Sequence, residues 1–135
     1  MIEAGGTTVS YKLFIKLAGT PEEVVIEDGE GRAGGDLKLR VGDDVCWVNA
    51  TGRNCKLKFR ELQLGRDEPR YKGRVWPFEG DGPGGDLDIP ASGWCGRVRA
   101  PGSGHGRKAD YVKYDVMVTG GGPALDLDPI IIIDR

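Results

Sequence analysis

The chain has 135 residues, of which 39% are hydrophobic and 30% are charged, and its formal net charge is −2. This length and composition predict one globular domain spanning residues 1–135. Its 23 glycines are too many for a helical bundle and lack the period of collagen, so they favour an all-β domain with many turns. The near-neutral charge excludes a nucleic-acid binder that relies on bulk charge. No apolar run is long enough to span a membrane.

Alternating apolar and polar residues predict the strands of the first half of the chain. The predicted strands are 9–17, 24–26, 37–41, 45–49 and 55–60. Only Phe14 breaks the alternation of the first of them, and a Gly42-Asp43 turn separates the third from the fourth. From residue 61 to residue 90 the pattern weakens, which indicates either a functional loop or short elements.

The second half of the chain predicts further strands at 94–100, 111–119 and 130–133. We therefore expect about seven to nine short strands without an amphipathic helix, arranged as a Greek-key β-sandwich. The predicted core residues are Tyr11, Leu13, Ile15, Val45, Trp47, Leu57, Phe59, Tyr114, Val116, Val118 and most of Ile130–Ile133.

Two segments carry a resemblance to a known family. The residues concerned are Gly42, Asp43, Val45, Trp47 and Asn49, then Cys55–Phe59, and finally Tyr111 and Tyr114 before an apolar last strand. This pattern resembles the cupredoxin family over about residues 36–60 and 94–134. The resemblance implies a cupredoxin-like Greek-key β-sandwich.

The resemblance does not extend to the family's metal. A blue-copper site needs two histidines, one cysteine and a weak axial ligand. Cys55 stands at the first histidine position, the cysteine position falls at Asp115 or Val116, and the only histidine of the chain is His105. A blue-copper centre within one chain is therefore excluded by counting, and we expect a metal-free domain without a cofactor.

The three cysteines, Cys46, Cys55 and Cys95, are odd in number and lack Cys-x-x-Cys spacing, which gives little support to a disulfide framework or a zinc ribbon. The N-terminus lacks the basic and apolar regions of a signal peptide, so we expect a cytoplasmic protein with reduced thiols. The alternative function is a soft-metal site for Cu(I), or a redox site, that uses Cys55 with Cys95, His105 or Met117.

Basic residues gather between residues 53 and 74, where eight Lys and Arg stand against three Asp and Glu. Because Arg, Tyr and Trp dominate interface hot spots, this stretch predicts a docking surface for an acidic protein partner. The expected contacts are Arg60, Arg66, Arg70, Tyr71, Lys72, Arg74 and Trp76. A solvated strand face that serves only solubility is one alternative, and a nucleic-acid surface is a less favoured one.

The residues for catalysis do not occur together in the sequence. His105 lies in a glycine-rich turn and lacks a positioned nucleophile and an orienting carboxylate. The aspartates lack the order of a calcium loop, and the glycine-rich turns lack the lysine of a phosphate loop. The sequence therefore predicts a non-catalytic binding or scaffolding module, which could also form homo-oligomers through its strand edges.

Overall fold

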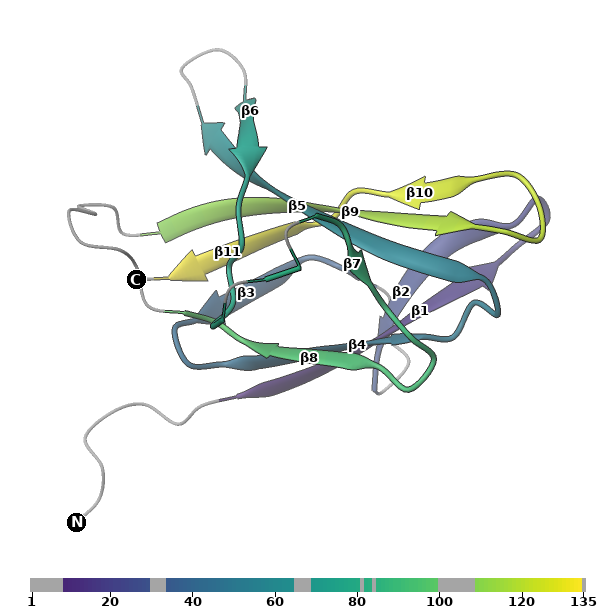
Figure 1. Cartoon of the computed structure of the whole chain (residues 1–135), viewed down its shortest axis with the longest axis horizontal. Coiled ribbons are helices and arrows are strands. Elements are labelled where there is room, and N and C mark those ends of the chain that lie inside the picture. Colours follow the sequence, from purple (N-terminus) through teal and green to yellow (C-terminus); the bar gives the residue numbers. More distant parts are fainter. Residues whose placement is uncertain are drawn as a thin grey trace.

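The computed structural model describes residues 9–29, 34–64, 69–80, 82–83, 85–99 and 109–134. Within these ranges the chain forms eleven strands and no helix (Figure 1). The strands are β1 (Ser10–Ala18), β2 (Glu23–Asp28), β3 (Leu37–Arg40), β4 (Asp44–Asn49), β5 (Asn54–Leu64), β6 (Pro69–Arg74), β7 (Leu87–Asp88), β8 (Trp94–Arg97), β9 (Ala109–Thr119), β10 (Leu125–Leu127) and β11 (Ile130–Asp134).

The strands form two mixed sheets. Sheet A has the order β2-β1-β4-β8, and sheet B has the order β3-β11-β9-β5-β6, with β10 added to β9 and β7 added to β5. The pairs β1–β4 and β3–β11 are parallel, and the other pairs are antiparallel. The all-β prediction is confirmed. The strands exceed the predicted number because β6 and β7 lie in the 61–90 region, where alternation is weak, and β10 is only three residues long.

The hydrophobic core lies between the sheets. Trp47 of sheet A is fully buried, and its ring contacts Tyr114 and Phe59 of sheet B at centroid distances of 5.4 and 6.0 Å. The predicted core is confirmed except that Tyr11 and, in the last strand, Ile130 and Ile132 are only half-buried. The other two isoleucines of β11, Ile131 and Ile133, are buried, because successive side chains of a strand point to opposite faces of the sheet.

Phe14 breaks the alternation because it lies on the outer face of sheet A. Its neighbours in β1, Leu13 and Ile15, are buried in the core. The ammonium groups of Lys12 and Lys16 lie 5.6 and 5.9 Å from the centre of the Phe14 ring. These cation–π contacts partly cover an aromatic side chain that would otherwise face water.

The predicted Gly42-Asp43 turn joins β3 to β4, and Gly42 has the positive φ, 94°, that such a turn requires. Asp43 is the only charged side chain that is buried among the described residues. Its carboxylate accepts hydrogen bonds from the backbone N–H groups of Val9 (3.0 Å) and Arg40 (2.9 Å). The turn therefore also fixes the start of β1.

The expectation of reduced thiols is wrong for two of the three cysteines. Cys46 and Cys95 form a disulfide between β4 and β8, where they lie directly opposite each other with Cα atoms 4.0 Å apart. Their separation of 49 residues hid this pair from reasoning on sequence spacing, because only the strand register brings them together. Cys55 is free and buried.

The part of the chain that the structure describes contains no helix with the length and apolar character needed to cross a membrane.

Candidate partner-binding surface

The basic segment forms a hairpin, β5–β6, at the edge of sheet B, and this hairpin extends past the end of the neighbouring strand pair β5–β9. β5 pairs with β9 from Asn54 to Glu61, and after this point its register continues with β6 alone. A shift in the β5–β6 register between Arg60 and Leu62 marks the change. In Figure 1 the end of β5 and the whole of β6 rise away from the rest of the sheet. The described backbone therefore presents this ribbon separately from the core.

The hairpin brings most of the predicted contact residues into one element. Arg60 lies opposite Arg74 in the register, and Tyr71 and Arg70 lie opposite residues 62 and 63 of β5. Lys72 is in the same strand, β6. The side chains of residues 61–64 and 69–74, and the whole of Arg66, lie outside the described residues, so the structure places four of these contacts by backbone register only.

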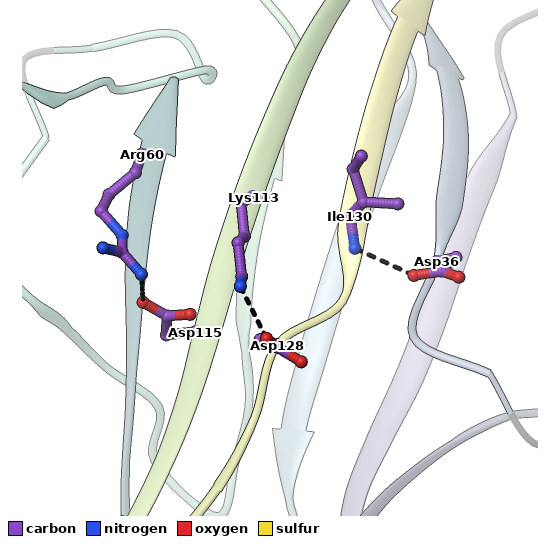
Figure 2. A network of polar contacts seen from close by, with 6 residues as sticks. All are labelled: Asp36, Arg60, Lys113, Asp115, Asp128 and Ile130. Atoms are coloured by element: carbon purple, nitrogen blue, oxygen red, sulfur yellow. Dashed lines mark hydrogen bonds and ion pairs between the residues drawn. The ribbon is translucent and has the colours of Figure 1, made fainter. Parts of the chain in front are cut away.

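At the base of the hairpin, basic side chains are paired with carboxylates (Figure 2). Arg60 Nη2 lies 2.5 Å from Asp115 Oδ2, and Lys113 Nζ lies 2.6 Å from Asp128 Oδ2. The hydrogen bond from Lys113 holds the pKa of Asp128 below its ordinary value. Beside them, Asp36 Oδ1 accepts the backbone N–H of Ile130 at 2.9 Å. The outer face of sheet B therefore carries interleaved charges of both signs.

Other basic residues that the sequence counted as one group are also paired. Arg53 Nη2 lies 2.9 Å from Glu22 Oε1, and Lys56 Nζ lies 3.8 Å from Asp88 Oδ1. These carboxylates lie outside residues 53–74 in the chain. The excess of basic residues counted within that stretch therefore did not include them. Three of the four basic side chains in the first half of this stretch are thus paired with carboxylates within the fold.

Trp76 follows β6, and its ring packs inward instead of projecting with the hairpin. It forms edge-to-face contacts with Phe59, Phe78 and Trp94 at centroid distances of 5.8, 5.4 and 5.6 Å. A Cβ added to Gly82 would come within 2.8 Å of the Trp76 ring. The ring is half-buried, so it supports the base of the hairpin more than it offers a free contact surface.

The alternative metal or redox set is not assembled among the described residues. Cys95 is in the disulfide, and Cys55, only 3% exposed, faces the core, where burial raises the pKa of its thiol to about 11. Met117 is the neighbour of inward-facing Val118, which lies opposite Cys55, so Met117 is on the other face of the sheet. His105 lies outside the described residues. In the described ranges, no three His, Cys, Asp or Glu residues are grouped as metal ligands.

One feature of the structure had no signal in the sequence. At one end of the two sheets, an open hollow of about 1080 Å³ lies where the β4–β5, β7–β8 and β9–β10 connections meet. Its lining residues include Asn49, Arg53, Cys55, Asp88 and Thr119. Although Cys55 is one of the lining residues, it is buried and its thiol faces the core. Burial also raises the pKa of this thiol, so it offers no reactive thiolate to the hollow.

Comparison with protein-family models gives no match for this chain, and comparison with curated proteins gives none either.

Proposed function

We propose that this protein is a non-catalytic binding or scaffolding module that docks an acidic protein partner on the β5–β6 hairpin. The observation that carries the proposal is the hairpin itself, which continues past the end of the β5–β9 pairing at Glu61. Its second strand contains Arg70, Lys72 and Arg74. A separate ribbon with several basic residues suits an acidic surface, because complementary charge speeds encounter and fixes register. Packed aromatic rings hold the base of the hairpin in place. Binding therefore costs less conformational entropy than it would if the hairpin had to be ordered first.

We also propose that the fold is a metal-free, cupredoxin-like Greek-key β-sandwich. Two mixed sheets with a core between them support this, as do Trp47 and Tyr114, which carry part of the resemblance and pack against each other across that core. The absence of a second histidine in the sequence removes the ligand set of a blue-copper site.

The binding proposal is tested by charge reversal on β6. We expect the Arg70→Glu/Arg74→Glu variant to bind a fluorescein-labelled glutamate-rich peptide at least about tenfold more weakly than the wild type, in anisotropy titrations at fixed ionic strength. Its melting temperature should stay close to that of the wild type, because the backbone of β6 pairs with β5 and extends away from the core (Figure 1).

A matched control separates the hairpin from bulk charge. Lys12→Glu/Lys16→Glu makes the same change of charge on the outer face of sheet A and should retain peptide binding. Equal weakening in both variants, or unchanged binding in the hairpin variant, would contradict docking on the hairpin. Tighter binding of a single-stranded oligonucleotide than of the peptide would favour a nucleic-acid partner.

The cytoplasmic location remains a prediction, and the Cys46–Cys95 disulfide is the observation that weighs against it. Disulfides persist mainly in oxidising compartments. Imaging of the tagged chain with a compartment marker decides between the two. Self-association through the sheet edges also remains a prediction, which light scattering coupled to gel filtration checks over a range of concentrations.

A further inference from the structure

The disulfide lies on the outer face of sheet A and not in the core. The neighbours of Cys46 in β4, Val45 and Trp47, are fully buried, so alternation turns Cys46 outward. Its partner Cys95 is exposed and belongs to β8, a four-residue strand at the edge of the sheet. A structural disulfide in a small core is usually shielded, whereas this one can be approached from solvent.

The strand registers place a lysine beside the disulfide. Lys12 of β1 lies opposite Cys46 of β4, which lies opposite Cys95 of β8, so the three residues form one row across the sheet. Lys12 is exposed. The next row contains Asp44 and Arg97, whose carboxylate and guanidinium pair with each other at 3.2 Å. Lys12 therefore stands in the same row as the two cysteines, and its ammonium lies beside this row, over the Phe14 ring.

We propose that the Cys46–Cys95 disulfide is a surface site of thiol–disulfide exchange, which reacts with a dithiol reductant while the rest of the domain stays folded. The geometry favours attack on Cys95, since its side chain is the exposed one of the pair and lies at the sheet edge. A cation near the sulfurs favours such a reaction, because it stabilises the thiolate that leaves.

The reaction balances as a two-electron exchange. A thiolate of the dithiol attacks Cys95 Sγ, the Sγ–Sγ bond breaks, and the electron pair leaves with Cys46 as a thiolate near Lys12. The second thiol of the reagent then displaces Cys95 from the mixed disulfide. The dithiol is oxidised to its own disulfide, and the two protons that it loses protonate the two cysteines of the protein.

The structure also indicates what the bond restrains. Among the described strands, β8 pairs with β4 alone. Its Trp94 covers Trp47, Phe78 and Trp76 with centroid distances of 6.2, 5.3 and 5.6 Å. The N–H of Glu79 donates to the carbonyl of Arg97 at 2.8 Å, which ties β8 to the segment after Trp76. Exchange at the disulfide would thus alter the restraint on an edge strand that packs beside the base of the hairpin.

The test uses the wild-type protein with dithiothreitol as the dithiol, followed by alkylation and mass spectrometry of peptides. Cys55 serves as an internal control, because it is buried and becomes reactive only when the core opens. We expect Cys46 and Cys95 to be alkylated at least about tenfold faster than Cys55 in native buffer. Alkylation of all three cysteines at one rate would overturn the proposal, since reduction would then require unfolding.

Two further variants test the roles of the individual residues. Lys12→Gln should slow reduction about threefold, the effect of one pKa unit at a Brønsted coefficient of about 0.5. Lys16→Gln removes the same charge and a similar contact with Phe14, together with an ion pair to Glu27, but lies four residues along β1 from the row. It should leave the rate nearly unchanged. Equal rates in the two variants would remove Lys12 from the mechanism. With reduced glutathione and a rapid alkylating trap, the wild type should carry glutathione mainly on Cys95 and the alkyl group mainly on Cys46. The reverse distribution would overturn attack on Cys95.

Discussion

Single buried polar groups hold parts of this fold together that apolar packing does not reach. Asp43 joins the first described residue of the chain, Val9, to the end of β3 through two backbone hydrogen bonds. Tyr114 donates its hydroxyl hydrogen to the carbonyl oxygen of Gly35, from the centre of sheet B to the segment before β3. In both cases a polar side chain satisfies backbone groups that the sheets leave without a ladder partner.

The Asp43→Ala variant should be less stable than the wild type by about 3 kcal/mol, because it leaves two backbone donors without their charged acceptor. Asp44→Ala is the control, since it removes only an exposed ion pair with Arg97 and should cost less than about 1 kcal/mol. Urea unfolding at pH 7 measures both. A similar loss in the two variants would show that the buried hydrogen bonds of Asp43 carry no special weight.

Cys55 makes stability depend on pH in the alkaline range. Because burial raises its pKa from 9.0 to about 11, the unfolded chain loses this proton at lower pH than the folded chain. The free energy of unfolding should therefore be unaffected by this group below pH 9 and fall between pH 9 and 11, by up to about 1.4 kcal/mol per pH unit.

The Cys55→Ala variant should have lower stability overall and a flatter dependence on pH over the same range. Urea unfolding at several pH values from 7 to 11 gives both slopes. Burial also raises the pKa of Tyr114, which steepens the fall above pH 10 in both proteins equally. Parallel curves for wild type and variant would mean that the Cys55 thiol does not stay protonated in the folded state.

Among the elements, β8 shows how a short edge strand is fixed by contacts of different kinds. It has one ladder neighbour, a disulfide to that neighbour, and an aromatic side chain over the core. Gly96 lets β8 pack closely against the aromatic rings. A Cβ at this position would come within 2.9 Å of the Phe78 ring and would also collide with Trp94. The missing side chain is therefore a packing requirement.

Gly96→Ala should lower the free energy of unfolding by about 2 kcal/mol, because the aromatic rings must shift to admit a methyl group. Gly29→Ala is the matched control, since nothing lies within 4 Å of a Cβ built there, and its stability should change by less than about 0.5 kcal/mol. Thermal unfolding monitored by circular dichroism compares the two. The same melting temperature for both variants would contradict close packing at Gly96.

At the scale of the whole molecule, the strands with clean alternation were predictable, and the contacts between distant segments were not. The alternation of β1, β4, β5 and β9 assigned Leu13, Trp47, Leu57 and Tyr114 correctly to the core. The backbone course of β6 was missed, because its sequence mixes glycine, proline and basic residues without a period.

The candidate site was predictable only as a stretch of sequence. Spacing alone showed that Arg70 and Arg74 are close in the chain, but not that the hairpin continues past the end of the β5–β9 pairing at Glu61. The partner of Arg60, Asp115, is 55 residues away, and Trp76 turned inward because Phe59 and Phe78 offer it an aromatic surface. Such contacts depend on the register between strands, which a local pattern does not contain.

The two sheets should unfold in one transition. All three tryptophans, Trp47, Trp76 and Trp94, belong to one cluster of aromatic rings that includes Phe59 and Tyr114 of sheet B. Loss of either sheet would expose this cluster. Tryptophan fluorescence and far-ultraviolet circular dichroism should therefore give the same urea midpoint. Two separated midpoints would mean that the sheets are independent folding units.

The position of β11 has a consequence for synthesis on the ribosome. Among the described strands, β3, which is made early, is connected to the rest of sheet B only through β11. The two strands pair in parallel at residues 131–134. While the chain is being translated, residues 37–40 thus have no place in their sheet until nearly the whole domain has left the exit tunnel. Pairing over such a separation is slow compared with local hairpins. The nascent chain must therefore keep Leu37 and Leu39 from other contacts, by its own collapse or with the help of a chaperone, until translation brings their neighbour.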